Sequence, residues 1–175
     1  MWTRRQRQMC IRDRNKGKAV YVEKPLALDL QSITDIEESI YRSENPKLFI
    51  GFNRRFSKSA QFIKQKLINN PANSINLRFS VPPLDSDHWT NIKEIGGGRI
   101  VGEAVHGIDL ACYLFDSLPQ SISASAPVDK TNNMVKDNQV FLNINFANGS
   151  HASLQYFSEA NQILSKERIE VHGEG

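Results

Sequence analysis

The sequence predicts an α/β part at the front followed by an α+β part. Near the front, a strand, a helix and a second strand follow one another with short connections, which is the pattern of a parallel crossover in a doubly wound sheet. Further along, segments of alternating apolar and polar residues predict a mostly antiparallel sheet. A glycine-opened apolar helix over residues 96–115 can cover one face of that sheet.

Length and composition limit the class of protein. The 175 residues, 39% hydrophobic and 23% charged, are typical of a globular chain of one domain, or one domain and part of another. No apolar run reaches the roughly 18 residues that a membrane span needs, so we expect no membrane partner. Cys10 and Cys112 are far apart in unlike contexts, which argues against a disulfide framework and favours a reducing cytoplasm.

The net charge of +3 belongs to the N-terminal tail. The first eighteen residues hold seven Lys or Arg and one acid, whereas the remainder has a net charge of −3. A nucleic-acid-binding function would rest on this tail alone, so we expect no nucleic-acid partner. The tail lacks the apolar core of a signal peptide, although an arginine-rich transit segment stays an alternative. Residues 8–14 resemble translated sequencing adapter, and we expect residues 1–14 to be a non-native or disordered tail without function.

The front part has three expected elements. The strand 19–22 is apolar and β-branched, and Pro25 ends it because proline has no N–H to donate to a neighbouring strand. Asp29 or Ser32 can cap a helix that runs to about residue 43 with apolar residues at three-to-four spacing. A second buried strand is expected over residues 47–52. These elements form the predicted parallel crossover.

The second part begins with a helix and continues with strands. Ser57 caps an expected helix that runs to about residue 68, and the dipeptide Asn148-Gly149 predicts a tight hairpin. Five segments alternate as strands do: 75–81, 122–126, 140–146, 151–157 and 169–172. We expect the 96–115 helix to back this sheet.

A cofactor loop is not found among the glycines. The spacing of Gly96, Gly98 and Gly102 superficially matches a dinucleotide fingerprint, yet it follows no convincing strand. We interpret it as a flexible turn into a helix, with Gly102 allowing close approach. Because no strand and glycine-rich turn precede residue 19, and both ends of the chain are abrupt, we expect a fragment that is inactive alone.

Three motifs carry a resemblance to a known family. The segments YVEKPLAL (21–28), GFNRRF (51–56) and GGGRIVGEAVHGIDL (96–110) resemble the Gfo/Idh/MocA oxidoreductases, in the same order and over about residues 15–175. The resemblance implies that residues 15–56 are the C-terminal part of a Rossmann-type dinucleotide-binding domain. Residues 57–175 would then be a truncated α+β substrate domain whose sheet forms a homo-oligomer interface.

The resemblance also implies a reaction. It indicates an NAD- or NADP-dependent oxidoreductase that transfers a hydride between the nicotinamide and a secondary alcohol of a sugar, an inositol-like polyol or a sugar derivative. The alternative is a non-catalytic sugar-binding or oligomerisation module with the same fold.

Lys24 and His106 are the proton-handling side chains of these motifs. Alcohol oxidation needs a base for the hydroxyl proton, and a histidine suits that work near neutrality; by resemblance, His106 is that base and contacts the substrate. Lys24 lies at the C-terminal end of its strand, which is where ligands bind in open α/β sheets. We therefore expect burial to lower the pKa of Lys24. We also expect its ammonium to hydrogen-bond the substrate oxygen. From spacing alone, His106 can equally be a packed helix histidine and Lys24 a solvated lysine.

The residue one helical turn before the histidine differs in this sequence from the one that is usual in the family. Many family members carry an aspartate one turn before the histidine, where this chain has Gly102. Glu103 is three residues before His106 and could share a helix face with it, so we take Glu103 as a third catalytic candidate.

The remaining candidates are polar groups near these motifs. We assign Glu23, Lys24, Pro25 and Arg54 to cofactor binding, with Glu23 and Pro25 shaping the turn. Arg54 and Arg55 could hold a phosphate or carboxylate, or be surface charge. His88 and Trp89 lie in an expected loop and could face a sugar, although a packed loop is equally compatible. No metal site is expected, because Glu103, His106 and Cys112 lack zinc-site spacing.

Overall fold

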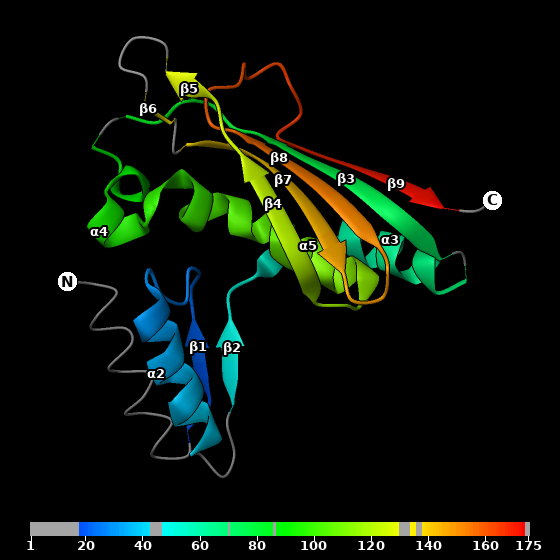
Figure 1. Cartoon of the computed structure of the whole chain (residues 1–175), viewed down its shortest axis with the longest axis horizontal. Helices are drawn as coiled ribbons and strands as arrows, with labels where there is room; N and C mark the ends of the chain where they lie inside the picture. Colours follow the sequence, from blue (N-terminus) through cyan, green and yellow to red (C-terminus); the bar gives the residue numbers. More distant parts are fainter. Residues whose placement is uncertain are drawn as a thin grey trace.

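The computed structural model describes residues 18–42, 47–69, 71–85, 87–129, 134–135 and 138–173. The expected tail, residues 1–14, lies outside the described residues. Figure 1 shows two units, a small one around β1, α2 and β2 and a larger one built on a five-stranded sheet. No helix in the described part of the chain is long and apolar enough to cross a membrane.

The small unit is the expected strand–helix–strand crossover. Strands β1 (Val20–Val22) and β2 (Leu48–Ile50) pair in parallel, and helix α2 (Leu30–Tyr41) connects them. Asp29 begins the helix, because its Oδ1 accepts a hydrogen bond of 2.8 Å from the backbone N–H of Ser32. The peptide bond between Lys24 and Pro25, just after β1, is cis. The prediction of a parallel α/β part is therefore confirmed.

The larger unit is a mixed sheet that is mostly antiparallel. Its strand order is β4-β7-β8-β3-β9. The five strands are β4 (Pro119–Ser125), β7 (Gln139–Phe146), β8 (His151–Phe157), β3 (Ala72–Ser80) and β9 (Glu167–Gly173). The expected hairpin joins β7 to β8, with Gly149 at a φ of 83° that favours glycine. The prediction of a mostly antiparallel sheet is confirmed, and one pair departs from it, because β3 and β8 pair in parallel across a long crossover.

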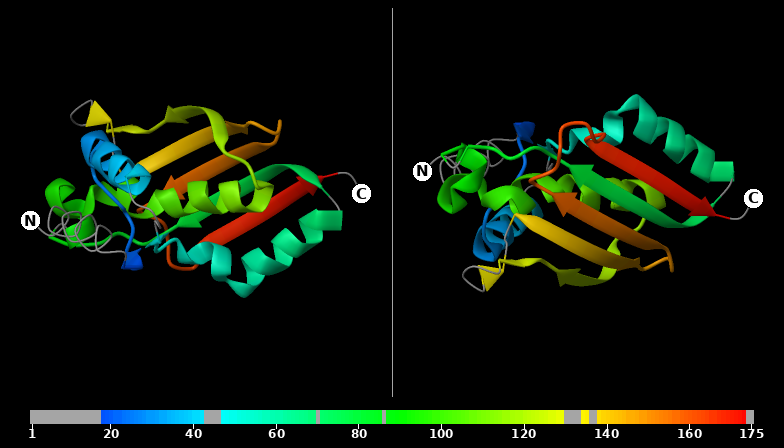
Figure 2. Two further views of the ribbon diagram at one scale, coloured as in Figure 1. Left: turned by 90° about the horizontal axis from the view of Figure 1, so that it is seen from below. Right: turned by 90° about the horizontal axis from the view of Figure 1, so that it is seen from above.

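Two helices lie on one face of this sheet. Helices α3 (Lys58–Asn69) and α5 (Val105–Phe115) cover it, and the opposite face is open to view in Figure 2. The buried core lies between the helices and the sheet, and Leu154 on β8 is fully buried in it. Gly107 allows α5 to approach closely, because a Cβ at that position would lie 2.6 Å from Leu154 Cδ1.

The expected helix over residues 96–115 is observed from residue 98 onward, but it is interrupted at its start and is π-helical over residues 100–104. Helix α4 (Lys93–Gly96) ends at Gly97 and Gly98, whose φ angles of 75° and 82° lie in the left-handed region. A π-helical segment, η3 (Ile100–Ala104), then leads into α5. Four short elements were not expected: η1 (Asn53–Phe56), η2 (Trp89–Asn91), β5 (Val128–Asp129) and β6 (Met134–Val135).

Candidate active site

The candidate site lies where the small unit meets the N-terminal end of α5. Lys24 comes two residues after the end of β1, and His106 lies in the first turn of α5. Phe52, which follows β2, packs edge-on against the His106 ring with a centroid separation of 6.0 Å. The structure therefore brings the ends of both parallel strands to the helix that carries the histidine.

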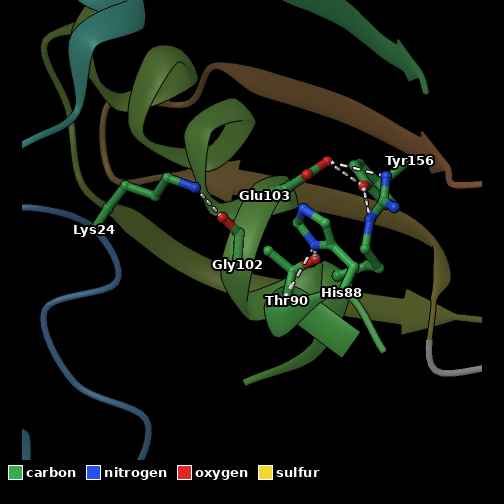
Figure 3. Close-up of polar contacts among 7 residues, drawn as sticks. Lys24, His88, Thr90, Gly102, Glu103 and Tyr156 are labelled. Atoms are coloured by element: carbon green, nitrogen blue, oxygen red, sulfur yellow. Dashed lines mark hydrogen bonds and ion pairs between the residues drawn. The ribbon is translucent and has the colours of Figure 1, made fainter. Parts of the chain in front are cut away.

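Lys24 reaches across from the small unit to η3. Its Nζ donates a hydrogen bond to the backbone carbonyl of Gly102, as Figure 3 shows. The side chain is half-buried. Burial lowers the pKa of Lys24, and the nearby Glu103 carboxylate acts in the opposite direction. The sequence-based expectation of a lowered pKa agrees with this environment.

His106 is a buried and neutral imidazole. Its residue is only 5% exposed, and among the described residues its Nδ1 has no hydrogen-bond partner. Burial, assisted by the positive charges of Arg54 and Lys24, lowers the pKa of His106 to about 4. At neutral pH the ring is therefore uncharged and able to accept a proton. A buried polar atom without a protein partner is a position that a ligand or water can complete.

Glu103 turns toward the sheet and makes no hydrogen bond or ion pair with His106. Its Oε2 accepts a hydrogen bond of 2.5 Å from the Tyr156 hydroxyl and lies 3.3 Å from Arg99 Nη2. The expected sharing of one helix face assumed α-helical geometry, whereas η3 is a π-helix with wider turns. The direct Glu103–His106 pairing considered from the sequence is absent between these two described residues.

Gly102 lies where there is little room for a side chain. A Cβ at this position would be 3.2 Å from the carbonyl oxygen of Gly96 and 3.9 Å from Thr90 Cγ2. The close approach expected of Gly102 is therefore observed, and it leaves the Gly102 carbonyl facing Lys24.

The two arginines of the 51–56 motif both pair with carboxylates. Arg55 binds Asp109 on α5 through Nε, at 2.9 Å from Oδ2, and through Nη2, and it stacks on Tyr113. Arg54 Nε lies 2.9 Å from Glu167 Oε1 at the start of β9. The two groups form an ion pair, but their relative orientation does not allow a hydrogen bond from Nε. Arg55 is thus engaged in joining η1 to α5, and Arg54 adds positive charge near His106.

His88 and Trp89 lie on the loop that precedes α4. His88 Nδ1 accepts from the backbone N–H of Thr90 at 3.4 Å and contacts Thr90 Oγ1 at 2.8 Å, so its other ring nitrogen carries the proton. Thr90 itself is buried against Gly96 and Gly102. This places His88 beside η3, as Figure 3 shows, while Trp89 is half exposed.

The turn residues Glu23 and Pro25 flank Lys24. Glu23 is exposed and accepts a hydrogen bond of 3.3 Å from the hydroxyl of Tyr21. A Cβ at Gly51 would lie 2.8 Å from Glu23 Oε2, so this carboxylate lies close to the end of β2.

Sequence reasoning did not find four residues that surround the site. Phe52 and Arg99 lie within two of the quoted motifs, so the motifs could have indicated them as site residues. Lys166 acts on the pKa of His106 from the segment before β9, and Tyr156 lies near the C-terminal end of β8. In sequence, neither of these two differs from ordinary strand or loop residues.

The described residues contain no cluster of three His, Cys, Asp or Glu side chains that could hold a metal ion. Cys112 packs against the core, and burial raises the pKa of its thiol. These observations leave Lys24, His106 and their neighbours as the chemistry-bearing groups of the site.

Comparison with known proteins supports the resemblance seen in the motifs. The family described as the GFO/IDH/MocA C-terminal domain matches residues 68–175. The chain belongs to the Gfo/Idh/MocA family. Inositol 2-dehydrogenase from Rhizobium meliloti (strain 1021) is 28% identical over 166 residues, which cover 90% of this chain and 48% of that protein. Oxidoreductase P35 from Formosa agariphila is 28% identical over 177 residues, which cover 95% of this chain and 53% of that protein.

Solved structures share the fold of this Gfo/Idh/MocA chain. Myo-inositol dehydrogenase from Lactobacillus casei, in complex with NAD(H) and myo-inositol, superposes with a TM-score of 0.78 at 18% identity. That match covers 96% of this chain and 49% of the other. An NAD binding oxidoreductase from Klebsiella pneumoniae gives a TM-score of 0.81 at 22% identity over 96% of this chain and 49% of that one. The chain spans about half the length of the relatives it matches.

Proposed function

We propose that the intact protein, meaning the full natural chain in which this sequence occurs, is an NAD(P)-dependent oxidoreductase acting on a secondary alcohol of a sugar, polyol or sugar derivative. The observation that carries this proposal is the meeting of Lys24 and His106 at one site, within a fold of the Gfo/Idh/MocA family. A lysine with a lowered pKa and a neutral buried imidazole are suited to proton transfer at an alcohol.

The two side chains have separate tasks in this mechanism. His106 is neutral at physiological pH, so its imidazole accepts the hydroxyl proton as the alcohol becomes a carbonyl. The Lys24 ammonium exchanges its bond with the Gly102 carbonyl for one with the substrate oxygen, where it stabilises developing negative charge. The edge-on ring of Phe52 restricts the orientation of the imidazole.

A nicotinamide cofactor, NAD or NADP, fits this end of the small unit. When bound, it supplies the acceptor for the hydride that leaves the alcohol carbon. Ligands of parallel α/β sheets bind beyond the carboxyl ends of the strands, where β1 and β2 end here. We assign the cofactor contacts to Glu23, Lys24, Pro25 and Arg54, and the unpartnered Nδ1 of His106 supports a ligand nearby.

A polyol is the substrate class that the relatives favour. The Rhizobium relative is named an inositol 2-dehydrogenase, and the Lactobacillus structure contains myo-inositol. For this chain we propose that His88 donates a hydrogen bond from Nε2 to a substrate hydroxyl and that Trp89 packs on the carbon skeleton. The tautomer held by Thr90 and the exposure of Trp89 support these roles.

Organisation and location complete the proposal. We assign residues 15–56 to the dinucleotide-binding domain and 57–175 to the substrate domain. The helix-free face of the sheet, open to view in Figure 2, supports a homo-oligomer in which a second copy packs on this face. The widely separated cysteines favour the cytoplasm as the location. Analytical ultracentrifugation of the intact protein tests the oligomer, and a monomer would contradict it.

Replacement of the lysine gives a direct test. Lys24→Met keeps the length of the side chain and removes the ammonium, and Lys18→Met is the matched control because Lys18 is exposed and outside the site. The intact protein is assayed for reduction of NAD and NADP with myo-inositol, other polyols and aldoses. We expect turnover in the wild type and in Lys18→Met, and a loss of about 10²–10³-fold in kcat for Lys24→Met.

Two results would contradict the proposal. Turnover in Lys24→Met equal to that of the wild type would remove the lysine from the mechanism. Binding of a polyol in calorimetry, with no nicotinamide reduction by the wild type over the whole panel, would instead support the alternative of a non-catalytic sugar-binding module.

A further inference from the structure

Two buried polar residues that the mechanism does not use converge on Glu103. Tyr156 is fully buried in β8, and Arg99 is 4% exposed at the residue before η3. Arg99 Nε donates to the Tyr156 hydroxyl at 3.0 Å, and that hydroxyl donates to Glu103 Oε2 at 2.5 Å. Arg99 also reaches Glu103 Oε2 directly at 3.3 Å. The carboxylate is therefore held by two donors that are themselves bonded to each other.

The arrangement leaves half of the carboxylate available. Both described contacts use Oε2, and the Glu103 side chain is 28% exposed. Figure 3 shows the Glu103 carboxylate turned toward Tyr156. These contacts hold the Glu103 carboxylate in one position at the edge of the site.

The charges around His106 show why a fixed carboxylate matters. Lys24 from the loop after β1, Arg54 from η1 and Lys166 from the segment before β9 each disfavour a protonated imidazole, and Glu103 from η3 favours it. Glu103 is also the group that most strongly favours the charged form of Lys24. A proton taken up by His106 creates a cation among three others, so the catalytic step needs this carboxylate nearby.

We propose that Arg99 and Tyr156 are positioning residues, which hold the Glu103 carboxylate beside Lys24 and His106. Through Glu103 they stabilise the imidazolium that forms when His106 accepts the substrate proton. The effect on turnover rests on the proposed function, whereas the effect on His106 itself does not.

Tyr156→Phe tests this role, because it removes the hydroxyl and keeps the ring in the core. Tyr113→Phe is the matched control, since Tyr113 also lies on the larger unit but contacts Arg55 and Lys64 instead of Glu103. Glu103→Gln gives the reference effect of losing the charge. The pKa of His106 is followed by NMR of the histidine ring in the intact folded protein, and kcat and KM are measured with the polyol that the wild type oxidises.

We expect Tyr156→Phe to lower the pKa of His106, in the same direction as Glu103→Gln and by a smaller amount. We expect kcat to fall about tenfold, which is typical of one lost hydrogen bond to a charged group, with KM changed less than about twofold. Tyr113→Phe should leave the pKa of His106 and kcat unchanged. Arg99→Lys, which keeps the charge but loses the second donor, should give an intermediate shift.

An unchanged pKa of His106 in Tyr156→Phe and Arg99→Lys, with reduced thermal stability alone, would show that the pair is a structural tie and overturn the proposal. If Tyr156→Phe does not fold, Arg99→Lys decides by the same titration. If the wild type oxidises no polyol, the proposed function fails, while the titration still decides whether Arg99 and Tyr156 act on the site.

Discussion

The two units of the chain bury their apolar residues very differently. In the larger unit, helices α3 and α5 and one face of the sheet enclose a continuous core that includes Leu77, Ile144 and Leu154, each at most 1% exposed. Among the described residues of the small unit, Val22 and Ile36 are the buried apolar ones, whereas Tyr41 on α2 is 89% exposed. The larger unit therefore has the core of a stable domain, and the small unit has little of its own.

The active-site candidates are divided between these units. His106 lies on the well-packed side, and Lys24 lies on the sparsely packed side. Polar contacts join the two: Lys24 with Gly102, Arg55 with Asp109 and Arg54 with Glu167. The alignment of Lys24 with His106 therefore depends on polar contacts at the junction, and the stability of the fold depends on the apolar core.

The largest effect on stability is expected in the core of the larger unit. Leu154→Ala empties a fully buried position on β8, so we expect the free energy of unfolding to fall by about 2–5 kcal/mol. Phe49→Ala, on β2, removes a larger side chain that is 60% exposed, and we expect a loss of less than about 1 kcal/mol. Urea denaturation followed by circular dichroism measures both. Equal losses would contradict the contrast between the units.

A second prediction concerns the junction. Arg55→Met leaves the Asp109 side chain, which is 10% exposed, without its bidentate partner, so we expect a loss of about 1–3 kcal/mol. The control is Arg42→Met, because Arg42 forms an exposed pair with Glu38 on α2, and its loss should cost at most about 0.5 kcal/mol. Thermal or urea unfolding compares the two variants. An effect of Arg55→Met no larger than that of the control would show that the junction pair does not stabilise the protein.

The buried histidine makes stability depend on pH. The pKa of His106 is lowered to about 4, so the unfolded chain takes up the proton first as the pH falls below about 6.5. We expect the free energy of unfolding to decrease between about pH 6.5 and 4, and His106→Asn to reduce this decrease. His151→Asn is the control, since His151 lies on the open face of the sheet in β8. Urea midpoints across this range provide the measurement, and equal slopes in wild type and His106→Asn would argue against a neutral buried ring.

The smallest effect is expected at the start of α2. Asp29→Ala removes the side chain that accepts from the backbone N–H and the hydroxyl of Ser32, so we expect a loss of about 1 kcal/mol. Because the small unit has little core, we expect the change to appear as faster amide exchange in α2, with β7 and β8 unaffected. Hydrogen exchange read by mass spectrometry resolves the two regions. Faster exchange throughout the sheet would mean that the units unfold together.

Much of the fold could be predicted from local patterns. Alternation and three-to-four spacing located β1, α2, β2, α3 and the strands of the sheet, and Asn148-Gly149 located the β7–β8 hairpin. The parallel pairing of β3 with β8 could not be predicted, since it depends on which strands far apart in the sequence become neighbours in the sheet. The π-helical η3 also could not be predicted, because Gly102 within it and Gly97 and Gly98 before it permit several backbone conformations.

The candidate site was predictable only in part. The motifs that contain Lys24 and His106 indicated both residues, although spacing alone gave no reason for them to meet. The partners of Glu103 were not predicted, because Tyr156 reaches it from β8, 53 residues along the chain. The alternation of Tyr156 with other apolar residues of its strand predicts only that Tyr156 belongs to the core.

The central claim is that His106 accepts a proton from an alcohol at a site shared with Lys24. The rate of nicotinamide reduction in a single turnover of the intact protein, compared between wild type and His106→Asn at one pH, tests it most directly. The account predicts a rate about 10²–10⁴-fold lower in His106→Asn, the usual contribution of a general base. A rate equal to that of the wild type would contradict it.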